Sequence, residues 1–85
     1  MSVFDAIENK KNHLGKKIEE AGNVIDLNNI NKIKRIHKDL DNMLGIWKNV
    51  DKTSPFKEED LKAISDTTDL LIKKADSLFK EEKYH

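Results

Sequence analysis

The side chains best suited to metal binding in this chain are a histidine and an aspartate one helical turn apart. His37 and Asp41 are four residues apart, so a helix would place both on one face. A zinc site needs three or four ligands, whereas His13 and His85 are distant in sequence and no HExxH or paired CxxC motif is present. We therefore expect no metal and no cofactor, and we interpret His37 and Asp41 as a surface contact.

Nucleophilic catalysis would need a serine that is oriented by a base within a shaped pocket. Ser2 and Ser54 occupy positions typical of helix caps, and Ser65 and Ser77 lie away from the apolar seam of their segment. A helical bundle of this size has little room for a pocket. The sequence therefore predicts a protein that is not an enzyme and has no catalytic residue.

Basic residues form two clusters with the chemistry to contact phosphate. They are Lys10, Lys11, Lys16, Lys17, Lys32, Lys34, Arg35 and Lys38. Such residues bind the nucleic-acid backbone electrostatically, but a single arginine offers little base readout, and no exposed aromatic is expected nearby to stack a base. A nucleic-acid-binding accessory protein is therefore an alternative interpretation, and solvated lysine faces are the more common outcome.

The composition describes one small domain. Eighty-five residues suffice for a single hydrophobic core and not for two. Sixteen Lys and Arg balance sixteen Asp and Glu, so the net charge favours neither nucleic acid nor anionic lipid. Cysteine is absent, and neither a leader-like start nor a run of eighteen apolar residues occurs. We expect a soluble cytoplasmic protein without membrane contact.

The spacing of apolar residues predicts a first helix over residues 3–21. Ser2 and Asp5 form a capping box at its start, and Gly22 with Asn23 provides a stop signal, because these residue types tolerate positive φ. The apolar residues of this segment fall within an arc of about 100°, which predicts a single core stripe.

A second helix, predicted over residues 27–49, carries the widest apolar face of the chain. Asp26 or Asn28 is expected to cap it. Its apolar residues span about 200°, an arc that needs packing partners on two sides. We expect this helix to lie between the other two, with packing in a dimer as the alternative.

A third helix, predicted over residues 55–82, begins with Thr53 or Ser54 as its cap and Pro55 in its first turn. Its seam is Leu61, Ile64, Thr68, Leu71, Ala75 and Leu78. The Thr68 hydroxyl is expected to bond to the Ile64 carbonyl. Acid-before-base pairs are predicted on its solvated face for Glu58 with Lys62, Asp69 with Lys73, and Asp76 with Lys80.

The sequence thus predicts an all-α fold, a small antiparallel three-helix bundle with a long C-terminal helix. Leucines 40, 44, 71 and 78 are predicted core residues. Gly15 and Gly45 lie inside helices, where each costs about 1 kcal/mol relative to alanine, so they are expected to mark close helix approaches or kinks.

Three apolar side chains are candidates for a protein interface. Ile46 lies at the edge of the wide apolar arc, Trp47 lies within it, and Leu70 lies opposite the seam of the third helix. A bundle alone leaves Ile46 and Leu70 exposed, so we expect a homodimer or a complex with a protein partner to cover this surface.

In size, charge density and lack of catalytic motifs, the chain resembles the small helical inhibitors, immunity proteins and adaptors of bacterial mobile elements such as phages and plasmids. No motif identifies a family, and the resemblance carries no individual residues. It implies a binding protein that acts by occupying the surface of a partner protein. A phosphate-contacting accessory protein and a structural homo-oligomer are the alternatives.

Overall fold

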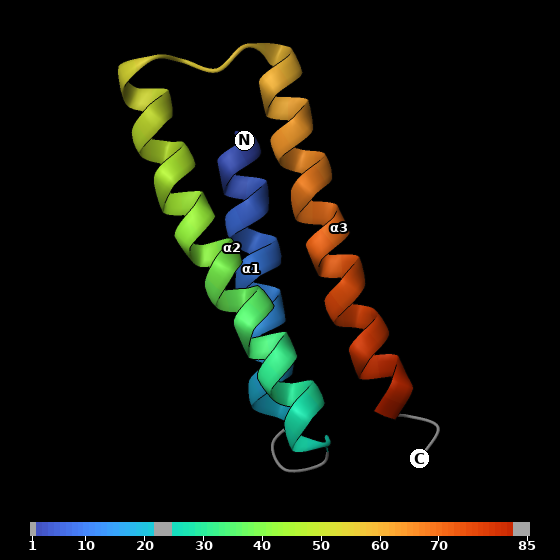
Figure 1. Ribbon diagram of the computed structural model, residues 1–85. Helices are drawn as coiled ribbons and strands as arrows, with labels where there is room; N and C mark the ends of the chain where they lie inside the picture. Colours follow the sequence, from blue (N-terminus) through green and yellow to red (C-terminus); the bar gives the residue numbers. More distant parts are fainter. Residues whose placement is uncertain (1, 22–24, 83–85) are drawn as a thin grey trace.

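The computed structural model describes residues 2–21 and 25–82 and contains three helices, α1 (Val3–Ala21), α2 (Leu27–Thr53) and α3 (Glu58–Glu82). In Figure 1, α1 runs down, α2 runs up and α3 runs down, so that α1 and α3 are parallel and α2 is antiparallel to both. No strand occurs among the described residues. The all-α three-helix bundle predicted from the sequence is confirmed.

The start of α1 forms the predicted capping box. The Asp5 backbone N–H donates to the Ser2 hydroxyl at 3.1 Å, and the Ser2 N–H donates to the Asp5 carboxylate at 3.3 Å. Two backbone donors that the helix leaves free are thereby satisfied. The predicted stop at Gly22 and Asn23 lies outside the described residues. Asp26, one of the two predicted caps, occupies the N-cap position of α2, but its side chain makes no capping hydrogen bond.

The predicted boundary between the second and third helices is wrong by several residues. Helix α2 continues past residue 49 to Thr53, where the Thr53 hydroxyl donates to the Asn49 carbonyl at 3.0 Å. The Ser54 N–H donates to the Val50 carbonyl at 2.8 Å and closes the last turn. Ser54 is therefore a C-cap of α2, and neither it nor Thr53 caps α3.

Helix α3 begins at Glu58, so Pro55 lies in the connection and not in the first helical turn. The Phe56 N–H donates to the Asp51 carboxylate at 3.0 Å, and the Lys57 N–H donates to the Asp60 carboxylate at 3.2 Å. Phe56 packs against the core. These contacts hold the connection in an extended path over the end of the bundle, so α3 begins three residues later than predicted.

The core consists of two clusters along the bundle axis. One contains Ile7, Leu40, Leu44 and Ile64, and the other contains Leu14, Ile33, Ile36 and Ala75. Each helix contacts both of the others, so α2 is not simply an intermediate layer between α1 and α3. Of the four predicted core leucines, Leu40 and Leu44 are buried, whereas Leu71 and Leu78 pack against the clusters with part of their surface exposed.

Thr68 is fully buried between the clusters, as the seam of α3 requires. Its hydroxyl donates to the Ile64 carbonyl at 3.0 Å, which confirms the predicted contact. No buried side-chain nitrogen or oxygen is left unsatisfied among the described residues. The polar side-chain groups buried in the bundle are therefore hydrogen-bonded within the protein.

Candidate functional site

Most of the predicted phosphate-binding lysines of α1 are committed to contacts inside the bundle. Lys10 pairs with Asp69 and Lys17 pairs with Asp76, both on α3, the second pair at 3.0 Å. Lys17 also lies 5.9 Å from the centre of the Phe79 ring. The three predicted pairs within α3 are absent from the described residues, because Asp69 and Asp76 pair with lysines of α1 and Lys62 pairs with Asp66.

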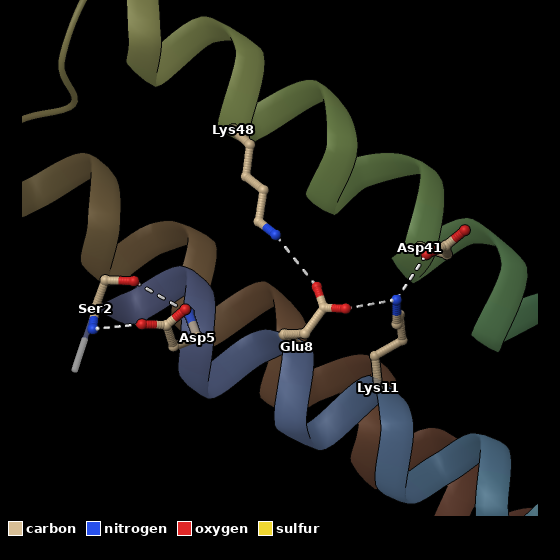
Figure 2. A network of polar contacts seen from close by, with 6 residues as sticks. All are labelled: Ser2, Asp5, Glu8, Lys11, Asp41 and Lys48. Carbon is tan, nitrogen blue, oxygen red and sulfur yellow. Dashed lines mark hydrogen bonds and ion pairs between the residues drawn. The ribbon is translucent and has the colours of Figure 1, made fainter.

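Lys11 lies at the centre of a polar network that joins α1 to α2 (Figure 2). Its ammonium group lies 2.8 Å from the Asp41 carboxylate and 3.1 Å from Glu8, and Lys48 approaches Glu8 at 3.3 Å from the other side. Only 12% of the Lys11 side chain is exposed. The network is a ladder of alternating charges along the α1–α2 contact, in which Asp41 pairs with Lys11.

The network shifts the ionisation of its members in consistent directions. Hydrogen bonds from Lys11 and then Lys48 lower the pKa of the Glu8 carboxyl, and a hydrogen bond from Lys11 lowers the pKa of Asp41. The bond to Asp41 raises the pKa of Lys11 against the opposing effect of partial burial. All three groups are therefore held in their charged forms, which favours a structural role over proton transfer.

The predicted phosphate-binding residues that remain exposed lie mainly on α2. Lys16 on α1 and the predicted phosphate-binding residues of α2 have no ion-pair partner among the described residues. We name the α2 group the basic patch; it comprises Lys32, Lys34, Arg35 and Lys38. A shallow open depression of about 440 Å³ lies there, lined by Asn31, Lys34, Arg35, Lys38 and Asp39.

The second half of α2 presents an outward face without any charge. We name it the uncharged strip; it comprises Asn42, Gly45, Ile46, Asn49, Val50 and Thr53, all of them exposed. These positions follow the i, i+3, i+4, i+7, i+8 spacing of one helix face. Ile46 is 60% exposed and Val50 is 42% exposed. A bundle of this kind normally covers such a face with charged residues, which makes the strip the strongest candidate for a binding surface.

Gly45 lies within this strip and has no structural use inside the bundle. A Cβ placed on it would meet no atom within 4 Å. An open depression of about 440 Å³ lies beside it between α2 and the start of α1, with Phe4, Lys48 and Asn49 among its lining residues. The predicted close helix approach therefore does not explain Gly45. Its missing side chain instead leaves room at the surface.

The three predicted interface residues differ in their surroundings. Ile46 and Leu70 are exposed, at 60% and 69%, on the outward faces of α2 and α3. Trp47 is partly buried and packs against the core cluster around Leu40 and Leu44. Ile46 thus belongs to the uncharged strip, Leu70 lies on a separate surface of α3, and Trp47 serves the core.

The predicted surface contact between His37 and Asp41 is replaced by two different contacts. The His37 ring packs over Gly15 of α1, and the Asp41 carboxylate bonds to Lys11. Gly15 therefore marks a close approach of α1 and α2, as one of the two readings of the internal glycines predicted. No group of three or more potential metal ligands occurs among the residues that the structure describes, and His85 lies outside them.

The uncharged strip was missed by the sequence reasoning, which treated Ile46 as the edge of an apolar arc. The signal was present, because the six positions share helical spacing and contain no Asp, Glu, Lys or Arg. It is a pattern of missing charge, and a search for apolar periodicity does not detect it.

Comparison with known proteins adds no functional assignment. No family model matches the chain, and no significant similarity was found to a curated protein or to a solved structure. Within residues 2–21 and 25–82, none of the three helices provides an apolar stretch that could traverse a lipid bilayer.

Proposed function

We propose that this chain is a small non-enzymatic helical protein that acts by binding a partner protein through the outer face of α2. The observation that carries the proposal is the uncharged strip. Charged residues make up 38% of the chain, yet the strip contains none over more than three helical turns. Its two apolar side chains, Ile46 and Val50, lie one turn apart and are exposed to solvent.

The shape of the strip favours a helix or another narrow ridge as the partner element. Gly45 has no side chain and lowers the surface at the edge of the strip beside Asn49, which lets a partner backbone or side chain approach α2 closely. The cost of an exposed glycine within a helix, about 1 kcal/mol, has no compensation within the bundle. Close contact of a partner with α2 at this position would explain why glycine occurs there.

The charge around the strip indicates an acidic partner. Arg35, Lys38 and Asp39 continue the same face of α2 toward its N-terminus, and Lys52 flanks its other end, so bases outnumber acids around the strip. These residues have no ion-pair partner among the described residues. We therefore propose a partner surface with apolar side chains opposite Ile46 and Val50 and carboxylates opposite Arg35 and Lys38, a typical arrangement of an interface core with a charged rim.

Nucleic acid is the less favoured partner because the basic surface is smaller than the sequence implied. Lys10, Lys11 and Lys17 are engaged in ion pairs across the bundle, so a phosphate backbone would have to break these pairs to bind them. The basic patch alone offers few phosphate contacts and no exposed aromatic side chain for stacking.

The proposal is tested by capture of binding partners from the source cells on the immobilised chain, after nuclease treatment. The diagnostic variant is Ile46→Lys, and its matched control is Leu27→Lys, which alters an equally exposed apolar residue of α2 outside the strip. We expect one protein to be retained by the wild-type chain and by Leu27→Lys and to be lost with Ile46→Lys. Circular dichroism should show the same helix content in all three chains.

A second variant, Gly45→Met, separates binding from folding. Methionine is a better helix former than glycine and meets open space at this position, so it should stabilise the chain while blocking the approach to α2. Loss of the captured protein together with increased stability supports the strip. Identical capture by wild-type chain, Ile46→Lys and Gly45→Met rules it out. Binding that disappears with nuclease favours the basic patch instead.

A further inference from the structure

The outer face of α3 has an arrangement of its own around Leu70. This leucine is 69% exposed, and the residues that share its face are small or flexible. They are Ala63, Thr67, Lys74 and Ser77, all exposed. The Thr67 hydroxyl donates to the Ala63 carbonyl at 2.9 Å, so its proton is already bonded within the helix. Thr67 can therefore be covered by another helix without its hydroxyl proton losing a partner.

A row of four charged residues runs beside Leu70 with an ordered sign pattern. Glu59, Asp66, Lys73 and Lys80 are spaced by seven residues, which places them along one edge of the helix face. The row reads acid, acid, base, base, and its midpoint falls next to Leu70. All four side chains are exposed.

This row is complementary to itself only when one copy is inverted. In an antiparallel pair of α3 helices centred on Leu70, Asp66 lies level with Lys73 of the second copy, and Glu59 lies level with its Lys80. The two-fold axis repeats both pairings, which gives four opposite-charge contacts. A parallel two-fold pair would instead place this row across from the opposite edge of the face, which holds Thr67 and Lys74, so the row would gain none of these pairs. The sign pattern therefore favours the antiparallel arrangement.

The charges of the row are available for such contacts. Asp69 and Asp76 are engaged with α1 lysines, and Lys73 and Lys80 have no ion-pair partner among the described residues. Asp66 pairs only with Lys62 at 3.3 Å, where the two side chains are 65% and 79% exposed, and such pairs contribute little. The formal net charge of the chain is zero, so no long-range repulsion opposes association of two copies.

We propose that the outer face of α3 is a self-association surface, on which a second copy of the chain docks antiparallel with Leu70 at the two-fold axis. The contact spans one helix face, so it is smaller than the ~1,200 Å² of a standard stable interface, and the dimer forms in a concentration-dependent manner. This surface is separate from the uncharged strip of α2, and the proposal does not rest on the proposed function.

The test is a charge-reversal exchange followed by sedimentation. One variant combines Glu59→Lys with Asp66→Lys, which makes the row entirely basic, and the other combines Lys73→Glu with Lys80→Glu, which makes it entirely acidic. Each variant alone should raise the Kd of the dimer at least tenfold, because every cross-helix pair becomes a like-charge pair. An equimolar mixture should restore association as a heterodimer, detectable by native mass spectrometry.

A matched control separates position from net charge. Glu19→Lys with Glu20→Lys, and Lys16→Glu with Lys32→Glu, change the net charge equally at exposed positions away from α3. These controls should dimerise like the wild-type chain at moderate salt, where distant charges are screened. Leu70→Lys should abolish association, whereas Ile46→Lys should leave it unchanged.

The orientation is tested by cross-linking, which the absence of native cysteine makes unambiguous. Ala63 and Ser77 are each seven residues from Leu70, so a mixture of Ala63→Cys and Ser77→Cys chains should form mainly the mixed disulfide. A wild-type chain that remains monomeric up to about 1 mM overturns the proposal, because even weak specific interfaces assemble at that concentration. The proposal is also overturned if the charge-reversed variants dimerise as strongly as the wild-type chain, or if their mixture fails to associate.

Discussion

The imidazole of His37 on α2 lies directly over Gly15 of α1, where a Cβ on residue 15 would meet the His37 Nε2 atom at 3.0 Å. The two helices approach closely at this point because position 15 has no side chain. The glycine therefore trades helix propensity for packing, whereas Gly45, with no neighbour within 4 Å, does not.

Replacement of Gly15 by alanine should consequently show coupling to His37. Alanine gains about 1 kcal/mol of helix propensity, but the new methyl group forces the ring to move, so the net gain should be small or negative. In a His37→Ala background the full gain should appear. Denaturant unfolding of the four chains in the double-mutant cycle measures the coupling, and equal effects of Gly15→Ala in both backgrounds would contradict it.

Gly45→Ala should raise the free energy of unfolding by about 0.5–1 kcal/mol. The added methyl group meets open space, and the unfolded chain loses conformational freedom. Chemical denaturation measures the change, with Gly15→Ala as the comparison in which the same substitution is sterically opposed. Destabilisation by Gly45→Ala would show that this position has a packing role within the bundle.

The core leucines should differ according to their burial. Leu40 is fully buried, so Leu40→Ala should reduce the free energy of unfolding by about 2–5 kcal/mol and can unfold so small a domain. Leu78 is partly exposed, and Leu78→Ala should cost only about 1–2 kcal/mol. Thermal and denaturant unfolding provide the comparison. Equal losses would mean that the exposed part of Leu78 is covered in solution.

Acid should weaken the ladder between α1 and α2. The folded-state pKa values of Glu8 and Asp41 are lowered from 4.5 and 3.8, so their contribution to stability is complete above these values and is lost as the pH falls through the lowered pKa values. The raised pKa of Lys11 has the opposite direction, and its contribution persists below 10.5 and is lost as the pH rises through the raised pKa.

The corresponding measurement is denaturant unfolding from about pH 7 to about pH 2, where carboxylates titrate. Glu8→Gln should flatten the decline in stability, because it removes a carboxylate whose ionised form the ladder stabilises. An identical acid profile for the wild-type chain and Glu8→Gln would show that the ladder does not stabilise the folded state.

Apolar periodicity predicted the helices and the core because packing dominates both. It located α1 at the observed boundaries, together with the Ser2 capping box and the buried Thr68 hydroxyl. The end of α2 could not be predicted in this way. Polar residues 51–53 read as a loop, and their helical state depends on contacts across the connection, such as the bond from the Phe56 N–H to Asp51.

The candidate surfaces were predicted less completely than the fold. Ile46 and Leu70 were identified as exposed apolar residues, but local spacing paired Asp69 and Asp76 with lysines of their own helix. Their actual partners, Lys10 and Lys17, lie 59 residues away, and only the packed bundle brings them together. Which lysines remain free for a ligand is therefore a property of tertiary structure and cannot be read from charge clusters in the sequence.

These two ion pairs also bear on the kinetics of folding. Both pairs link α1 to α3 across 59 residues, so they close long loops and can form only after α3 has docked in its final axial register. Their φ values should be close to zero, so Lys10→Met or Asp76→Asn should accelerate unfolding and leave the folding rate nearly unchanged, as a chevron plot would show. The ion pairs that engage Lys10 and Lys17 are therefore expected to form late in folding. They should slow the unfolding of the bundle and have little effect on the rate at which it folds.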